Sequence, residues 1–311
     1  MHNNTTKILL RCNNFLDILE NYLSLKEFES LSPMTISSKR LTVISFMNYL
    51  SDNNVKDFHR LTQKNVTGYL TTLTNLSSST ISGRTFILRH FFNYLNGKNL
   101  MLFSGNELFP VIFTNKRERI LSFYSIEEIR RIVSAIDRST PYGKRDFIVV
   151  LLAAELGIRS GDILRLKMSN IHWEHNTIEF VQYKTKFSNQ LPLLENIKYA
   201  LIDYLQSWHP MSDFEYIFIG IKNGGKPLTN TCIHQIVSKY FKKAGIDISE
   251  RKHGPHAMRH SLASNMLHNN TPMHVIKEVL GHSNINATRF YLNIDVDTLR
   301  ELALEVPYET V

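Results

Sequence analysis

Residues 255–267 have the sequence PHAMRHSLASNML. Proline at the first position is typical of a helix N-terminus, where its missing N–H needs no partner. His256 and Arg259 are three positions apart and therefore share one face of the predicted helix. Met258 and Leu262 begin an apolar stripe on the other side. Taken alone, such a polar pair is most often two ordinary surface residues, but it places an imidazole and a guanidinium side by side.

A second basic residue stands at a predicted helix junction further upstream, in the sequence LGIRSGD of residues 156–162. The apolar run 147–156 predicts a buried helix that ends just before this turn, and Ser160 is suited to cap the next helix. Arg159 is therefore expected on a short, rigid turn, either as a surface arginine or as one that projects into a cleft. Asp162 either orients this guanidinium or lies favourably in the first turn of the following helix.

The stretch between these two segments predicts a small antiparallel sheet. Residues 171–173, 177–181 and 191–193 have the character of strands, with Ser188-Asn189 as a turn before the third. Lys184 lies between the second and third strands. A hairpin lysine is most often a solubilising surface group, although a flexible ammonium there is also suited to a general acid.

Downstream of the helix, residues 280–292 have the sequence LGHSNINATRFYL. His282 stands just past a helix that the pair Thr271-Pro272 opens, and Tyr291 lies on a further short predicted helix. Taken alone, the histidine is typical of a helix C-terminus and the tyrosine of a hydrophobic core. Because both residues follow the basic residues in the sequence, both are candidate catalytic residues.

The composition is that of a globular protein with an excess of basic residues. The chain has 311 residues, with 36 Lys and Arg against 28 Asp and Glu, and a pI near 9.3. This balance favours a polyanionic partner. Two cysteines, Cys12 and Cys232, are too few for a disulfide framework or a zinc ribbon. The sequence has no apolar signal segment and no stretch long enough to span a membrane, so we expect a cytoplasmic protein without membrane contact.

Helical periodicity fills the first hundred residues and then fails, which predicts two domains. The first, residues 1–104, is expected to be a bundle of four short helices. Residues 105–122, with glycine, proline and a charged run, predict a linker. The second, residues 123–311, opens with a capping-box spacing at Ser125 and is expected to be mostly helical, with the small sheet and a C-terminal tail helix.

Basic residues on the predicted helices of the first domain are candidate DNA contacts, although surface helices normally carry such charges. They are Lys39, Arg40, Arg84 and Arg89. The basic residues are spread along the chain rather than gathered in one tail, which fits a long contact with a duplex.

Three histidines close in sequence raise the question of a metal site. His256 and His260 have the i, i+4 spacing of a zinc-binding helix, and His253 is nearby, but Ala257 stands where a zinc metalloprotease has its glutamate. The neighbouring sequence supplies no cysteine or carboxylate cluster as a third ligand. We therefore expect no metal and no cofactor.

Four segments of the second domain resemble, in order, the signature segments of the tyrosine recombinases, the superfamily of phage integrases and Xer recombinases. They are LGIRSGDIL, KTKFSNQLPL, HAMRHSLASNML and LGHSNINATRFYL. The resemblance covers about residues 120–300. The first domain is similar to the family's SAM-like core-binding domain by pattern and position.

The resemblance implies a role for each matching residue. The matches are Arg159 and Arg259 for the two catalytic arginines, Asp162 for the supporting acidic residue, Lys184 for the hairpin lysine, His256 for the histidine of the pair, His282 for the later histidine or tryptophan, and Tyr291 for the nucleophile. Ala257 departs from the pattern, because many members have an acidic or other polar residue there. This departure affects local hydrogen bonding rather than the chemistry.

The resemblance also implies an architecture and an activity. The expected fold is mainly α with a small antiparallel β-sheet, in which a helical core-binding bundle and a catalytic domain form a C-shaped clamp on DNA. The implied activity is site-specific recombination through a 3′-phosphotyrosyl intermediate and a Holliday junction, for integration or excision of a mobile element or resolution of DNA. The implied partners are duplex DNA at specific sites and other protomers in a homo-tetramer on synapsed DNA. The protein would be a monomer in solution, and accessory DNA-bending proteins are left open as partners.

Two other functions stay open at this point. A type IB topoisomerase-like enzyme would use the same chemistry to relax DNA without strand exchange. A non-catalytic DNA-binding regulator would use the helices around Gly281 as a helix-turn-helix. The second alternative leaves Arg159, Lys184 and Tyr291 unexplained.

Overall fold

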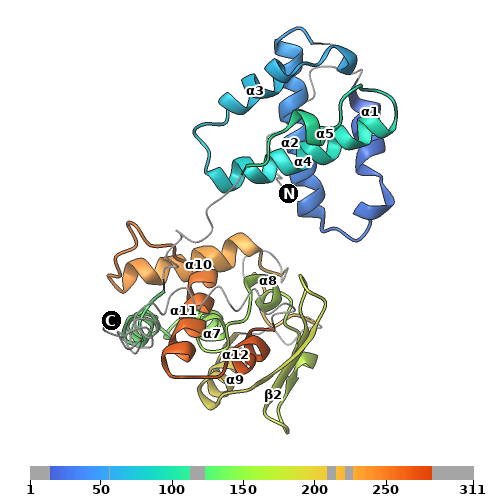
Figure 1. Ribbon diagram of the computed structural model, residues 1–311. Coiled ribbons are helices and arrows are strands. Elements are labelled where there is room, and N and C mark those ends of the chain that lie inside the picture. The colour runs from blue at the N-terminus through green and yellow to red at the C-terminus, as the bar shows by residue number, and fades with distance from the viewer. Residues whose placement is uncertain (1–14, 56, 113–122, 209–214, 221–226, 282–311) are drawn as a thin grey trace, which may run out of the picture. The chain divides into compact units, whose positions relative to one another are not determined.

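The chain divides into two compact units (Figure 1). Each unit contains a large cluster of buried hydrophobic residues. The first unit comprises residues 1–116 and the second residues 117–311. The computed structural model describes residues 15–55, 57–112, 123–208, 215–220 and 227–281. The described part is mainly helical with a small three-stranded antiparallel sheet, as the sequence predicts.

The first unit is a bundle of helices around an aromatic core. Its described helices are α1 (Leu16–Leu23), α2 (Pro33–Asp52), α3 (Gln63–Thr71), α4 (Ser78–Gly97) and α5 (Gly105–Leu108). The side chain of Ser32 accepts a hydrogen bond from the Thr35 amide and caps α2, directly before a proline at the first helical position. In the core, the ring of Phe46 on α2 meets Phe92 on α4 edge-on, with 5.4 Å between centroids.

The segment after α4 differs from the linker expected over residues 105–122. Residues 105–108 form α5, and Leu108 and Phe109 are buried in the core of the first unit. The guanidinium of Arg89 on α4 also donates to the carbonyl oxygens of Phe109 and Pro110, at 3.3 and 2.7 Å. A stretch of four residues is too short to show helical periodicity in the sequence. The order of residues 105–110 therefore comes from packing that the sequence pattern does not show.

The second unit is built around a helix buried on nearly all sides. The described helices are α6 (Ile126–Ser134), α7 (Pro141–Ala154), α8 (Ser160–Ile163), α9 (Glu195–Trp208), α10 (Asn230–Lys243), α11 (Pro255–His268) and α12 (Met273–Leu280). The expected capping box opens α6, where Ser125 and Glu128 exchange hydrogen bonds. From Ile148 to Ala154, every residue of α7 is buried in the core, against which α9, α10 and α11 pack.

The small sheet has the order β1-β2-β3, with strands β1 (Ile171–His172), β2 (Thr177–Val181) and β3 (Ser188–Pro192). Ile178 pairs with Leu191, and both are buried. The third strand begins at Ser188, so the pair Ser188-Asn189 lies in a strand and not in the expected turn. The reason is tertiary: Asn189 is buried, and its amide donates to the Val279 carbonyl of α12 at 3.5 Å.

Candidate active site

Arg159 lies on a tight turn between two helices. After α7, Gly157 adopts a φ of +60°, and α8 begins at Ser160, so Arg159 precedes the helix in an extended conformation. Leu156 and Ile158 are buried on either side of the glycine and anchor the turn. The guanidinium of Arg159 donates to the side-chain oxygen of Gln182. The turn is thus short and rigid, as expected, with Ser160 as the first helical residue rather than the cap.

Arg259 reaches the same region from α11. It is buried, and its two terminal nitrogens donate to the carbonyl oxygens of Gly157 and Leu280. These carbonyls lie just beyond α7 and at the end of α12, where helices leave acceptors without internal partners. The fork of Arg259 therefore ties the end of α12 to the turn after α7, two residues before Arg159.

Lys184 stands exposed in the turn between β2 and β3, as the sequence predicts. Asp162 holds this turn, because its buried carboxylate accepts a hydrogen bond from the Tyr183 amide at 2.8 Å. Burial raises the pKa of Asp162, while the charges of Arg159 and Arg259 act in the opposite direction. Asp162 therefore connects the first turn of α8 to the lysine hairpin.

His256 lies in the first turn of α11, directly after Pro255, and is exposed. Desolvation lowers the pKa of its imidazole, and the positive charges of Arg259, Lys184 and Arg159 lower it further. Arg159 and Lys184 come from distant parts of the sequence and Arg259 from the same helix, yet all three lie near enough to lower the pKa of this imidazole. The structure therefore brings four of the predicted residues into one basic site.

Two predicted residues, His282 and Tyr291, lie outside the described residues, as does the tail helix expected at the C-terminus. The last described residue before them is Gly281, which ends α12 in the left-handed conformation with a φ of +58°. The described chain therefore reaches the site two residues before His282, where the Leu280 carbonyl accepts a hydrogen bond from Arg259.

Gln182 is a residue of this site that sequence reasoning missed. It is 1% exposed and bonds to Arg159 on one side and to the Leu280 carbonyl on the other. A signal was present, because strand alternation through the buried residues Ile178 and Phe180 places position 182 on the inward face. A polar side chain at an inward position needs a buried partner.

Metal ligands and membrane-spanning helices were also sought in the part of the chain that the structure describes. There, no group of three or more His, Cys, Asp or Glu side chains is placed to hold a metal ion. In the same residues, no helix combines the length and the apolar character that crossing a membrane requires.

Comparison with protein-family models decides the family. A model of the phage integrase family matches residues 123–297, and a model of the N-terminal SAM-like domain of phage integrases matches residues 19–99. The chain belongs to the phage integrase family. The two matches fall in the two units of the structure, so the helical first unit of this integrase-family chain is its SAM-like domain.

Individual relatives extend the comparison over nearly the whole chain. Tyrosine recombinase XerC of Oceanobacillus iheyensis is 26% identical over 293 residues, which cover 92% of this chain and 93% of XerC. The chain spans less than half the length of two other curated relatives that it matches, 44% and 42%.

Two crystal structures show the same fold. The XerH site-specific recombinase bound to its palindromic difH substrate, a post-cleavage complex, has a TM-score of 0.74 at 21% identity and covers 92% of this chain and 83% of that one. A lambda integrase tetramer bound to a Holliday junction has a TM-score of 0.70 at 16% identity and covers 88% and 76%.

Three of the four candidate DNA contacts in the SAM-like unit make contacts within that unit. Lys39 is buried, with its ammonium 4.1 Å from the centre of the Phe28 ring. Arg40 forms a two-pronged ion pair with Glu20, and Arg89 binds the carbonyls that follow α5.

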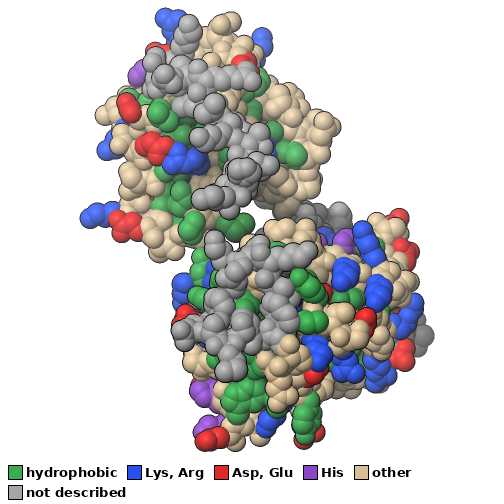
Figure 2. All heavy atoms as spheres, turned by 180° about the vertical axis from the view of Figure 1, so that it is seen from behind, with side chains coloured by type: hydrophobic (Ala, Val, Ile, Leu, Met, Phe, Trp, Pro, Cys, Tyr) green, Lys and Arg blue, Asp and Glu red, His purple; other side chains and the backbone are tan. Residues whose placement is uncertain are grey.

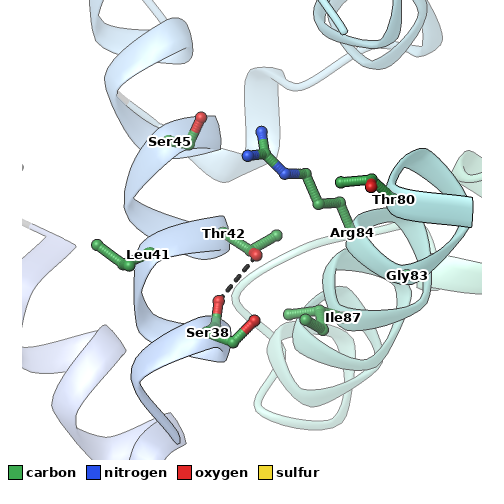
Figure 3. Close-up of a pocket in the computed structure, with 8 residues that line it drawn as sticks. All are labelled: Ser38, Leu41, Thr42, Ser45, Thr80, Gly83, Arg84 and Ile87. Carbon is green, nitrogen blue, oxygen red and sulfur yellow. Dashed lines mark hydrogen bonds between the residues drawn. The ribbon is translucent and has the colours of Figure 1, made fainter. Parts of the chain in front are cut away.

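Arg84 has a different environment, a pocket between α2 and α4 (Figure 3). The pocket has a volume of about 460 Å³. It is lined by Ser38, Leu41, Thr42, Ser45, Thr80, Gly83, Arg84 and Ile87. Arg84 extends from α4 toward α2 across this pocket, whose walls carry several hydroxyl groups.

Proposed function

We propose that this integrase-family protein is a site-specific tyrosine recombinase that cuts and rejoins duplex DNA through a bond to Tyr291. The observation that carries the proposal is the convergence of Arg159, Lys184, His256 and Arg259, which the sequence keeps up to 100 positions apart. A phosphodiester is an anion, and two arginine forks beside a lysine and an imidazole are suited to bind and transform it.

The first step is a transesterification. The Tyr291 oxygen attacks the scissile phosphorus, a 3′-phosphotyrosyl bond forms and the bond to the 5′-oxygen breaks. At pH 7 a free tyrosine pays about 4 kcal/mol to ionise, so a base that takes its proton during attack lowers the barrier. His256 is suited to that role because its lowered pKa keeps the imidazole neutral.

The other residues handle charge and the leaving group. Arg159 and Arg259 stabilise the negative charge that builds on the non-bridging oxygens, with His282 as a further donor. Lys184 gives a proton to the departing 5′-oxygen from its exposed turn, which Asp162 holds in place. A 5′-hydroxyl from a partner strand then attacks the phosphotyrosine and restores both the backbone and the tyrosine. The phosphoester energy is conserved, so the proposal requires no cofactor.

DNA binding is proposed to involve both units in a clamp around the duplex. Lys and Arg side chains gather over one side of the second unit (Figure 2), where they can meet phosphates. In the first unit, Arg84 is the candidate that we retain, because its side chain lines the pocket between α2 and α4, beside the hydroxyl groups of Ser45 and Thr80. Lys39, Arg40 and Arg89 would first have to leave their present contacts.

Assembly is proposed to follow the relatives. The lambda integrase structure is a tetramer on a Holliday junction, and we propose that this protein, a monomer in solution, forms the same state on two synapsed sites. Accessory DNA-bending proteins would act at this stage, and cellular DNA as substrate implies a cytoplasmic location. A type IB topoisomerase-like activity would instead relax supercoiled DNA as a single subunit without paired sites, which a relaxation assay on site-free plasmid distinguishes.

Trapping on nicked suicide duplexes cut from the DNA that flanks the gene tests the proposal. The wild-type protein is expected to accumulate a covalent DNA adduct that migrates slowly under denaturing conditions, because the short 5′ fragment diffuses away. Tyr291→Phe is expected to bind the same DNA without any adduct. Tyr199→Phe is the control, since Tyr199 is 67% exposed on α9 and is expected to leave adduct formation unchanged. An adduct formed by Tyr291→Phe would overturn the assignment.

A further inference from the structure

Gln182 combines deep burial with a fully used amide. It follows β2 directly and is 1% exposed. Its oxygen accepts hydrogen bonds from the Arg159 guanidinium and from the Thr185 hydroxyl, the latter at 2.6 Å. Its nitrogen donates to the Leu280 carbonyl at 3.4 Å. One side chain thus bonds to the arginine turn, the lysine hairpin and the end of α12.

The Leu280 carbonyl is a shared acceptor. It receives the Gln182 amide and also one terminal nitrogen of Arg259. A chain of hydrogen bonds therefore runs from Arg159 through Gln182 and the end of α12 to Arg259. This chain connects the two guanidinium groups through one buried amide, in addition to the bond from Arg259 to the Gly157 carbonyl, two residues before Arg159.

The packing around the amide is tight. A Cβ atom on Gly281 would lie 2.0 Å from the Gln182 nitrogen, so only glycine permits this approach. The residue after this glycine is His282. The amide therefore also borders the point where the chain leaves α12.

We propose that Gln182 is a positioning residue that aligns Arg159 with Arg259 for the scissile phosphate. The inference rests on the proposed role of Arg159 in phosphate binding. An amide suits this position because its oxygen orients the guanidinium without neutralising its charge, which stays available to the phosphate. Its nitrogen also supplies the donor that a carbonyl at the negative end of a helix requires. Neither a carboxylate nor an apolar side chain provides both.

Two substitutions separate geometry from charge. Gln182→Met keeps the length of the side chain but removes all three hydrogen bonds. We expect it to slow adduct formation on saturating suicide DNA about 10- to 100-fold, since a small misplacement of a binding group costs about that much, while DNA affinity stays within about threefold. Gln182→Glu retains the acceptors but neutralises Arg159 and faces the Leu280 carbonyl with a negative charge. It is expected to lower both the rate and the affinity.

The matched control is Asn189→Leu. Asn189 on β3 is also a buried amide that donates to a carbonyl of α12, that of Val279. This variant shows how far the loss of one side-chain amide hydrogen bond to α12 lowers the stability and the rate by itself. We expect an unfolding temperature close to that of Gln182→Met but a rate within about threefold of wild type. Equal rates for Asn189→Leu and Gln182→Met would overturn the inference.

A double-mutant cycle tests whether Gln182 acts through Arg159. The planar guanidinium fork is absent in an Arg159→Lys background. In that background, Gln182→Met is expected to lower the rate of adduct formation by less than about threefold. Independent effects that multiply would contradict the inference. If Gln182→Met is unfolded at the assay temperature, Gln182→Glu in the same cycle gives the decision. A wild-type protein that forms no adduct would reject the proposed function itself, whereas a normal wild-type rate with uncoupled substitutions rejects only the role of Gln182.

Discussion

At the scale of single residues, protonation of His256 is set by its surroundings. The ring is partly desolvated and faces the charges of Arg259, Lys184, Arg159 and the neighbouring His234, all of which lower its pKa. A histidine protonates more readily in water than here, so the neutral form persists to lower pH. A proposed base that stays neutral is ready to accept the proton of a tyrosine.

The pH dependence of adduct formation follows from this shift. Because the pKa of His256 lies below the usual value of about 6.5, the rate should hold as pH falls to about 6.5 and decline only below it. Single-turnover rates on suicide DNA between pH 8 and 5 at constant ionic strength measure this, with circular dichroism as a check on folding. A decline centred above pH 6.5 would remove His256 from the role of base.

At the scale of elements, the end of α12 is a tightly constrained point near the site. Gly281 combines a left-handed φ of +58° with a close approach to Gln182. The carbonyl of Leu280, one residue earlier, holds two side chains of the site. A helix end is suited to this task, because its last carbonyls have no partners within the helix.

Gly281→Ala tests this constraint against a matched glycine. Gly245 has a similar φ of +64°, but its nearest neighbour is an Arg131 nitrogen 3.7 Å from a built Cβ. Both substitutions are expected to cost about 1–2 kcal/mol of unfolding free energy from backbone strain alone. Only Gly281→Ala should also slow adduct formation, by about tenfold or more, because it displaces Gln182. Chemical denaturation measures the stability of the two variants, and single-turnover assays measure their rates of adduct formation. Equal rates would show that the close approach of Gly281 to Gln182 does not matter for function.

At the scale of the whole molecule, each of the two units has a large hydrophobic core of its own. The first is rich in aromatic rings, with Phe46, Phe91 and Phe92 fully buried, and the second is dominated by aliphatic residues around α7. Each core has its own helices, and the chain divides between residues 116 and 117. Such units are expected to unfold as two cooperative transitions rather than one.

Substitution of one core residue at a time checks this independence. Phe46→Ala should destabilise the first unit by about 3–5 kcal/mol, because it removes a fully buried ring. Phe218→Ala is the counterpart in the second unit, where Phe218 is also fully buried. Differential scanning calorimetry should show a shift of one transition in each variant while the other stays in place. A common shift of both would mean that the units unfold together.

The sequence by itself determined the family and the mainly helical class, and it predicted the residues of the candidate site. The motifs around Arg159, Lys184 and the His256–Arg259 pair could be found because each lies in a short segment with local signals. A glycine ends a helix before Arg159, a hairpin holds Lys184, and a proline opens α11. Signals of this kind act over a few residues, and local backbone chemistry is enough to predict them.

Only the tertiary structure decided how these residues are held. The bonds from Arg159 to Gln182 and from Arg259 to Gly157 join positions 23 and 102 residues apart. The contact of Asp162 with the Tyr183 amide and the burial of Lys39 against Phe28 are likewise absent from any local pattern. The physical reason is that a buried polar group takes whichever partner packing brings to it, and packing depends on the whole fold.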